Sequence, residues 1–461
     1  MSEAIQGQMV EARKWAQEQF AAVSLGDVRL ERRAVTLGER MALSPAASLP
    51  QQMEGHSSLM AAYRFLDNAQ VRHETLEAPH WRQTRAQAAE QARVLLVQDI
   101  TILDYSRYGD TMVGLGPVGD GRGKGLMLHS TLAVLPGTRQ VMGLMHQQVF
   151  ERKPHHGAKP RSRPKAERES RVWRESVEAI GAPGAQSQWV VVADSETDHT
   201  DFLLACRAQG LHFNVRLWRE NRLMIQGEER VNLFESVRRW DAQVSKSITL
   251  AARRGQKARE ARVQVSFGQV TLPVPRSEAR LTVWIVHAWE EDAPAGVEKV
   301  EWFLASSLAV ESGSEALERL EWYTTRWVVE DYHQCLKTGC AIEHRDLEQA
   351  ARIKRLLGLL AVVAVRLLQL RDKARQQPDS PASTIADPLE VAILAAKVGA
   401  PVAEMTAVTF WRGVARLGGF LGRRRDGDPG WKTLWRGWQQ LQLLVEGARL
   451  SATLSNGATC V

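Results

Sequence analysis

The stretch from Arg93 to Tyr105, RVLLVQDITILDY, carries a clear strand signal in this chain of 461 residues. Its first part is a continuous apolar run that ends at Asp99, and such a run is typical of a strand buried on both faces. A second apolar run, in QWVVVADSETD at 188–198, ends at Asp194. Because a helical pattern at 167–181 lies between the two runs, the sequence predicts an α/β domain with a mixed sheet.

Each of the two aspartates has an ordinary alternative, because an aspartate after an apolar strand is often a helix cap or a turn residue. Ligand sites in open α/β sheets nevertheless form at the carboxyl ends of strands and at the adjoining helices. Asp99 and Asp194 are therefore candidate site residues if a third group from a later helix joins them.

The segment WYTTRWVVEDYHQCLKTG, at 322–339, supplies such a helix. At about 100° per residue, Tyr323, Arg326, Glu330 and Lys337 fall within an arc of about 60°, while most of the remaining circumference is apolar. One interpretation is an Arg326–Glu330 pair at i,i+4, worth about 0.2–0.5 kcal/mol. The other is a carboxylate that holds a metal, flanked by groups that hold phosphates, because a nearly buried helix rarely keeps charges without partners.

Three converging carboxylates repel one another unless a divalent cation binds, and Mg²⁺ suits an oxygen donor set of this kind. Two such ions, about 3.5–4 Å apart, activate a water or a 3′-hydroxyl and stabilise the leaving oxygen of a phosphodiester. The cations along the stripe are spread over two helical turns, which fits an extended polyanion. A net charge of +7 favours the same kind of partner.

The composition indicates an ordinary globular protein, with 44% hydrophobic and 25% charged residues. Its four cysteines form no CxxC pair, so neither a disulfide scaffold nor a zinc site is indicated. The N-terminal segment reads as a charged amphipathic helix and not as a signal peptide. The longest apolar run, LLGLLAVVAV at 356–365, is about half of what a bilayer requires. We therefore expect a cytoplasmic protein without a membrane partner.

The pattern divides the chain into three parts. Residues 1–72 read as a helical N-terminal domain, and residues 73–371 as an α/β domain. Strand signals without a helix indicate a β-rich insertion at about 205–312 within that domain. Residues 372–461 read as a helical C-terminal domain.

The spacing of Tyr323, Arg326, Glu330 and Lys337 resembles the Y–(2)–R–(3)–E–(6)–K signature of the DDE transposases of the IS4 family. Further stretches carry the resemblance along nearly the whole chain: WAQEQFAAVSLGDVRLERR, AAYRFLDN, LLVQDITILDY, VVADSETD, AVVAVRLLQLRD and WKTLWRGWQQLQ. The resemblance implies an RNase H-like catalytic domain at 73–371 with a β-rich insertion, an all-α DNA-binding domain at 1–72 and an all-α dimerisation domain at 372–461. It also implies a bacterial, nucleoid-associated protein. It implies that Asp99, Asp194 and Glu330 are a catalytic triad that binds two Mg²⁺ ions, with Mn²⁺ as a substitute.

The resemblance also implies roles for residues outside the triad. Trp302 matches a tryptophan that stabilises a flipped base, although a strand aromatic is usually a core residue. Arg216 matches an arginine near the transposon end. Arg122 and Lys124 are DNA-contact candidates, or else part of a solvated hairpin turn. Phosphate binding is implied for Tyr323, Arg326, Lys337, Arg122, Lys124 and Arg216, and recognition of the DNA end for Arg29, Arg32 and Arg33.

The segment 152–171 holds eight Lys or Arg, two Asp or Glu and three Pro. We expect it to be a flexible loop that adds salt-dependent affinity for phosphates.

These observations lead to one prediction and two rivals. The prediction is a Mg²⁺-dependent cut-and-paste transposase that binds terminal inverted repeats as a homodimer in a synaptic complex. It cleaves the ends through a DNA hairpin and joins the 3′ ends to target DNA. The first rival is an RNase H-like nuclease without strand transfer, and the second is a non-catalytic DNA-binding inhibitor of transposition.

Overall fold

The computed structural model describes residues 3–153, 169–250, 259–294, 296–423, 426 and 429–457. The expected basic loop therefore falls largely, at 154–168, outside the described residues. No helix in the described part of the chain is long and apolar enough to cross a membrane.

Five strands form the centre of the sheet in the order β4-β3-β1-β5-β6. Strands β4, β3 and β1 pair in antiparallel fashion, whereas β5 and β6 run parallel to β1. This order and these directions are those of an RNase H-like core, so the predicted α/β class is confirmed. The strands are β1 (Arg93–Asp104), β3 (Gly123–Val134), β4 (Val141–Phe150), β5 (Gln188–Ala193) and β6 (His212–Leu217).

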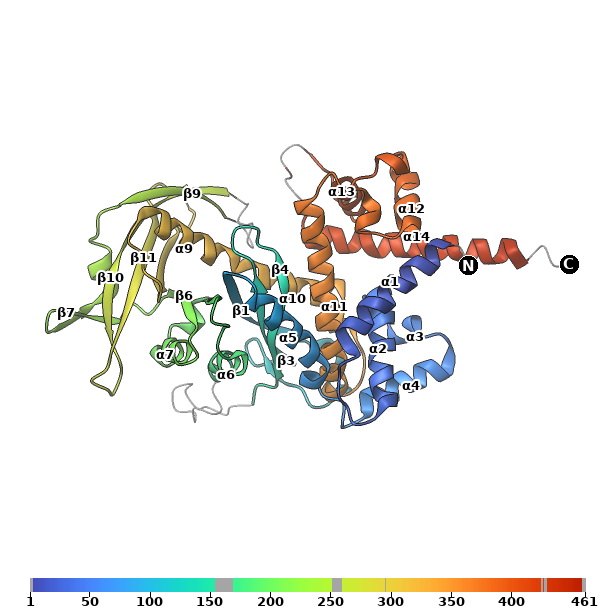
Figure 1. Ribbon diagram of the computed structural model, residues 1–461, viewed down its shortest axis with the longest axis horizontal. Helices are drawn as coiled ribbons and strands as arrows, with labels where there is room; N and C mark the ends of the chain where they lie inside the picture. Colours follow the sequence, from blue (N-terminus) through green and yellow to red (C-terminus); the bar gives the residue numbers. More distant parts are fainter. Residues whose placement is uncertain are drawn as a thin grey trace.

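Helices cover both faces of this central sheet (Figure 1). Val94 and Leu96 of β1 belong to a core that includes residues of α6 (Arg171–Ile180) and α7 (Thr200–Ala208). Leu95 and Val97, which point to the opposite face, belong to a second core that includes residues of the long helix α11 (Ala350–Gln376). Both faces of β1 are thus buried, which explains its continuous apolar run. Helix α5 (His73–Ala89) packs on β4 and α11.

The β-rich insertion continues the same sheet. Strand β12 pairs in antiparallel fashion with β6, and the order continues through β11, β10, β7 and β8, with β9 paired to β10. Strand β6 pairs in parallel with β5, so it belongs to the core, and the added strands begin at β7. These strands are β7 (Leu223–Gln226), β8 (Glu229–Asn232), β9 (Val244–Leu250), β10 (Arg259–Pro273), β11 (Arg280–Glu290) and β12 (Glu301–Ser306), and a short β2 (Gly116–Val118) pairs with β3.

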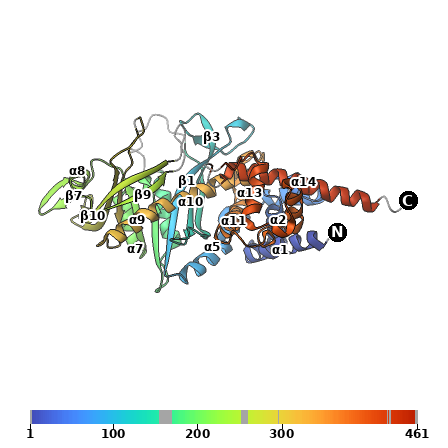
Figure 2. The same cartoon turned by 90° about the horizontal axis from the view of Figure 1, so that it is seen from above.

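The two helical regions lie at the end of the molecule opposite the insertion (Figures 1 and 2). Helix α11 (Ala350–Gln376) joins the regions, because it contacts α2, α4, α5 and α13. It also runs without interruption across the domain boundary expected at 371. The remaining helices are α1 (Glu3–Phe20), α2 (Val28–Leu43), α3 (Leu49–Gln52), α4 (Gly55–Asp67), α8 (Leu233–Val237), α9 (Gly313–Thr325), α10 (Trp327–Gln334), α12 (Pro388–Val398), α13 (Ala407–Leu417) and α14 (Trp431–Gly457).

Candidate active site

The sheet brings the first two acids to one edge. Strands β1 and β5 are neighbours and run parallel, and their pairing extends to Val97 and Val192. Asp99 lies two residues beyond Val97, and Asp194 lies two residues beyond Val192. The Asp194 side chain accepts a hydrogen bond from the backbone N–H of Glu196 at 2.9 Å and so caps a short 3-10 turn, Ser195–Thr197. Asp194 can therefore cap this turn and also lie at the same edge of the sheet as Asp99.

Arg326 connects the third acid to this edge. Its guanidinium donates one hydrogen bond to Asp99 and another to Glu330, each at 2.6 Å. The arginine side chain is only 8% exposed, whereas that of Glu330 is 42% exposed. The i,i+4 pair expected on the helix thus exists, and the same guanidinium also reaches the strand β1. Asp99 and Glu330 face the same space, with a cation held between them.

The electrostatics of this space indicate crowded negative charge. Burial raises the pKa of Asp99 to about 6; the charge of Arg326 lowers this pKa, and the charges of Asp194 and Glu330 raise it. Burial, together with the charges of Asp194 and Asp99, raises the pKa of Glu196 to about 7. Burial opposes the charge of Arg326, but the neighbouring carboxylates outweigh burial and hold the pKa of this guanidinium above its usual range. Sequence reasoning did not include Glu196 in the site, although it lies two residues after Asp194.

The donor set suits a divalent cation, because three carboxylates from different elements contribute to one electrostatic site. Among the described residues, no group of three His, Cys, Asp or Glu side chains already has a geometry that would hold a metal ion. Arg326 currently neutralises Asp99 and Glu330, so the acids would have to release its guanidinium to share an ion. The oxygen donors of Asp99, Asp194 and Glu330 are of the chemical kind that a divalent cation prefers.

The predicted helix at 322–339 differs from a regular one. Helix α9 ends at Thr325, α10 begins at Trp327, and residues Cys335–Gly339 form a π-helical turn. Tyr323, Arg326 and Glu330 precede the π-helical turn, and Lys337 lies within it. Lys337 lies 3.7 Å from Glu343, whose side chain also accepts a hydrogen bond from the backbone N–H of Asp104 at the end of β1.

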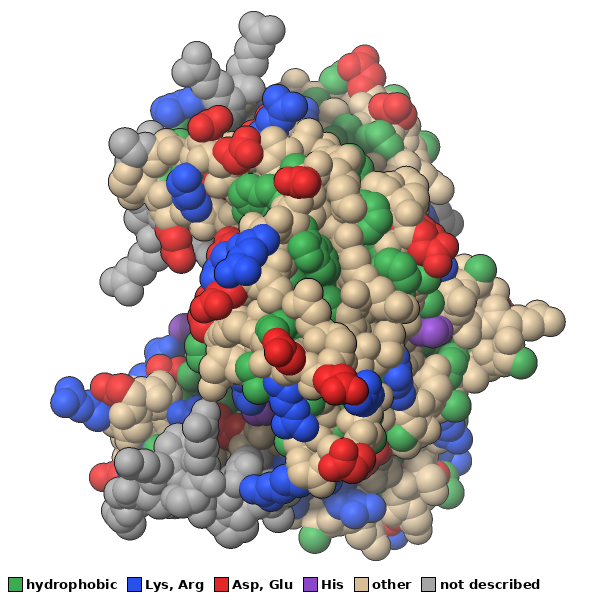
Figure 3. Space-filling model, turned by 90° about the vertical axis from the view of Figure 1, so that its left-hand side faces the viewer, with side chains coloured by type: hydrophobic (Ala, Val, Ile, Leu, Met, Phe, Trp, Pro, Cys, Tyr) green, Lys and Arg blue, Asp and Glu red, His purple; other side chains and the backbone are tan. Residues whose placement is uncertain are grey.

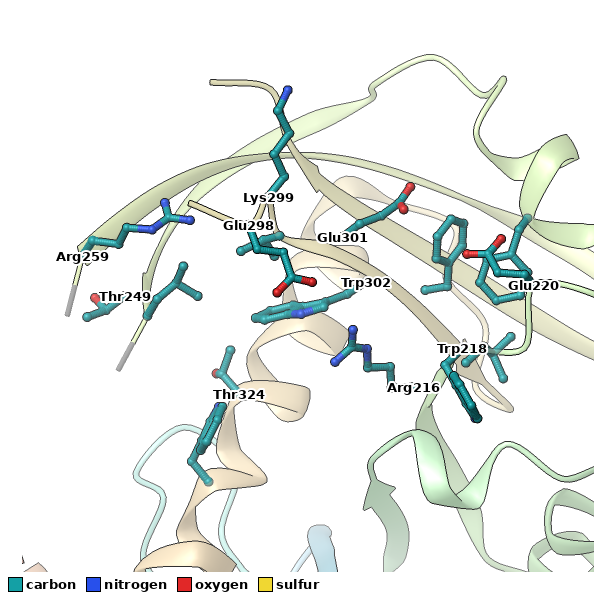
Figure 4. Close-up of a pocket in the computed structure, with 16 residues that line it drawn as sticks. Arg216, Trp218, Glu220, Thr249, Arg259, Glu298, Lys299, Glu301, Trp302 and Thr324 are labelled. Atoms are coloured by element: carbon teal, nitrogen blue, oxygen red, sulfur yellow. The ribbon is translucent and has the colours of Figure 1, made fainter. Parts of the chain in front are cut away.

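Tyr323 is buried and contacts Trp302 edge to face, with 5.2 Å between the ring centroids. Trp302 is 7% exposed and lines a pocket of about 340 Å³ beside the site (Figure 4). The pocket brings together Trp302 and Arg216, two residues far apart in the sequence. It adds Trp218 and Trp327, which sequence reasoning did not single out. The position of Trp327 directly after Arg326 in the sequence could have indicated that this tryptophan lies near the site.

The other basic candidates lie apart from the acids. Arg122 is 93% exposed and lies 3.7 Å from Asp120, and Lys124 forms an ion pair with Asp110. Basic and acidic side chains are interspersed on the face of the molecule formed by the insertion (Figure 3). The remaining candidates are on helix α2, where Arg29 and Arg32 are exposed and Arg33 is half-buried.

Family comparisons agree with this geometry. A transposase DNA-binding model matches residues 12–71, and a transposase DDE domain model matches residues 146–366. Together they define a DDE transposase with its own DNA-binding region. A third model, the Tn5 transposase dimerisation domain, matches residues 362–458. The chain therefore belongs to the Tn5-like DDE transposases, and the IS4 family expected from the signature is consistent with the DDE match.

These matches confirm the predicted class of protein. They support DNA binding and the formation of a homodimer, and they support a nuclease or transposase activity. Domains of the DDE type generally use divalent metals. Asp194 and Glu330 lie within the matched DDE segment, whereas Asp99 precedes it.

Proposed function

We propose that the protein is a Mg²⁺-dependent cut-and-paste transposase that acts on terminal inverted repeats. In this proposal it cleaves the ends through a hairpin and joins the 3′ ends to target DNA within a dimeric synaptic complex. One observation supports the proposal above the others. Arg326 holds Asp99 of β1 and Glu330 of α10 at hydrogen-bond distance in a site whose electrostatics also include Asp194.

In this proposal Asp99, Asp194 and Glu330 hold the metal ions. When bound, the ions supply an activated water or 3′-hydroxyl and stabilise the leaving oxygen. Asp99 must give up its proton first, and a pKa of about 6 leaves it mostly ionised at neutral pH. Arg326, once released from the acids, is placed to hold a phosphate beside them by charge-assisted hydrogen bonds.

Hairpin formation requires a base to leave the helical stack, and the pocket beside the site supports this part of the proposal. Trp302 lies in the pocket with Arg216 at its side, so an aromatic face and a cation are available together. Because Trp302 is mostly covered, Tyr323 or another neighbour must move before a base can stack on its face.

The test uses the full-length protein, Mg²⁺ and DNA that carries the inverted repeats flanking the gene. Hairpins and strand-transfer products are the expected result. Simple nicks would favour a nuclease without strand transfer, and bound but intact DNA would favour an inhibitor. Asp99→Asn should abolish cleavage and retain binding, and Asp104→Asn on the same strand is the matched control. Full cleavage by the Asp99 variant would contradict the assignment of the triad.

A further inference from the structure

Trp218 is an unusual surface residue in this chain. It follows β6 directly, and 60% of its side chain is exposed. Every other tryptophan, tyrosine and phenylalanine side chain that the structure describes is buried or half-buried. Single exposed apolar residues are common on protein surfaces, so exposure alone assigns no role. The surroundings of the indole provide the further evidence.

The backbone that carries Trp218 is held in place from below. The N–H groups of Trp218 and Arg219 both donate to the same carboxylate oxygen of Asp198, each at 3.0 Å. Asp198 is fully buried and pairs with Arg222 on the other side of the loop. The buried carboxylate of Asp198 thus fixes the loop. A fixed loop loses less conformational entropy on binding a ligand than a flexible loop does. The indole is presented to solvent from a rigid support.

Trp218 also lines the pocket that contains Arg216 and Trp302 (Figure 4). Figure 4 draws the Arg216 side chain between the two tryptophans. Within the described part of the chain, Arg216 Nε is buried without a hydrogen-bond partner. A buried donor without a partner is unfavourable, so this guanidinium is suited to an anion that comes from outside.

Three acidic residues line the pocket, namely Glu220, Glu298 and Glu301, and among the described residues none of them forms an ion pair with Arg216. Arg238 binds both Glu220 and Glu301, at 3.1 and 3.0 Å. Arg216 and Trp218 are two residues apart at the end of a strand, and alternate residues of a strand share one face. A cation for a phosphate therefore stands beside an exposed aromatic surface for a base.

We propose that Trp218 is a second stacking residue, which takes an unpaired nucleobase of DNA at the mouth of the pocket while Arg216 binds its phosphate. The inference rests on the proposed function and deepens it by naming a specificity-determining contact. A paired base inside a duplex offers no free face, so the ligand is a base that has left the stack or belongs to a single strand. Trp218 is accessible as it stands, whereas Trp302 must first be uncovered.

The test measures binding alone. The full-length protein, in Ca²⁺ and without Mg²⁺, is titrated into a blunt labelled duplex and into the same duplex with a single-stranded thymine extension. Fluorescence anisotropy reports both affinities. Wild type should prefer the extended duplex, and Trp218→Ala should lose this preference by about tenfold, as expected for one base stacked on an aromatic ring. Affinity for the blunt duplex should not change, and Trp218→Phe should retain most of the preference.

Leu223→Ala is the matched control, because Leu223 is 40% exposed on β7, the next strand along the chain, and does not line the pocket. An unchanged preference in Trp218→Ala, or an equal loss in Leu223→Ala, would overturn the inference. A change in oligomeric state by light scattering would assign Trp218 to a protein interface and would also overturn it. Failure of the proposed function remains distinguishable. If wild type only nicks DNA but the preference depends on Trp218, the stacking contact stands and the transposition proposal falls.

Discussion

Arg326 lies 2.6 Å from Asp99, although 227 positions separate the two residues in the chain. The contact turns a local pair on a helix into a tertiary link between the strand β1 and the helix α10. It also means that, when no metal is bound, the guanidinium of Arg326 supplies the positive charge beside Asp99 and Glu330. Metal binding and release of this arginine should therefore be coupled.

The first prediction concerns this coupling. Arg326→Gln removes the charge that lowers the pKa of Asp99, so this pKa should rise above about 6. A metal needs the ionised carboxylate, so Mn²⁺ affinity, followed by electron paramagnetic resonance, should fall off at a higher pH than in wild type. Arg326→Lys, which keeps the charge, should resemble wild type more closely. Identical pH profiles for wild type and Arg326→Gln would contradict the coupling.

The second prediction concerns buried histidines in the core. His80 Nδ1 lies 2.6 Å from Gln19 Oε1, and its Nε2 accepts a hydrogen bond from the backbone N–H of Leu144, which together require a neutral ring. Burial lowers the pKa of His80 to about 4, so the unfolded chain takes up the proton first as the pH falls. The stability that this histidine contributes is present above about pH 6.5 and is lost progressively toward pH 4, by up to about 3 kcal/mol.

Urea denaturation at about pH 7 and about pH 5 measures this loss. His80→Gln should lose less stability than wild type between the two pH values. Asp99 and Glu196 have raised pKa values, so their contribution to the free energy of unfolding increases as the pH falls. This contribution is the same in wild type and in His80→Gln, so the difference between the two proteins reports on His80. Equal losses in the two proteins would show that His80 does not carry the effect.

The third prediction concerns the contact between α13 and α14. A Cβ atom at Gly437 would lie 1.7 Å from the carbonyl oxygen of Val414, so the two helices approach too closely for any side chain there. Gly437→Ala should separate the helices and destabilise the C-terminal region by about 1–3 kcal/mol or more. Analytical ultracentrifugation should show a weaker dimer, since the dimerisation match covers both helices.

Gly447 provides the control on the same helix, because a Cβ atom there would meet nothing within 4 Å. Gly447→Ala should be neutral or stabilise α14 by about 1 kcal/mol through helix propensity. If both glycine variants behaved alike, the close approach at Gly437 would not be the cause.

The fourth prediction concerns the N-terminal helix α2. Arg29 is 90% exposed and Arg32 is also exposed, so both can reach phosphates of a DNA end. If each contacts one phosphate, Arg29→Ala and Arg32→Ala should each reduce the slope of log affinity against log salt by about 1. Titrations at several salt concentrations give this slope. Unchanged slopes in both variants would place the recognition of the DNA end elsewhere.

Much of the architecture could be predicted from sequence because the local signals are strong. The apolar runs that end at Asp99 and Asp194 belong to strands buried on both faces, and such strands leave a clear pattern. The polar stripe pointed to Arg326 and Glu330, which the structure does place near Asp99. Their roles as metal and phosphate ligands remain predictions.

The remaining details depend on contacts that no local pattern encodes. The π-helical turn at Cys335–Gly339 contains Lys337, and no local pattern in the sequence predicts this turn. The contact of Tyr323 with Trp302 joins a helix to a strand of the insertion. That β12 would extend the edge of β6 depended on pairing partners distant in sequence, which strand propensity does not reveal.

The helix α11 has a mechanical consequence for the dimer. The DDE match ends at residue 366 and the dimerisation match begins at residue 362, so both boundaries fall within this one rod of 27 residues, about 40 Å long. A helix packed on both regions transmits orientation, unlike a flexible tether. Two subunits that associate through their C-terminal helices would therefore hold their two candidate active sites at a fixed distance and a fixed relative orientation.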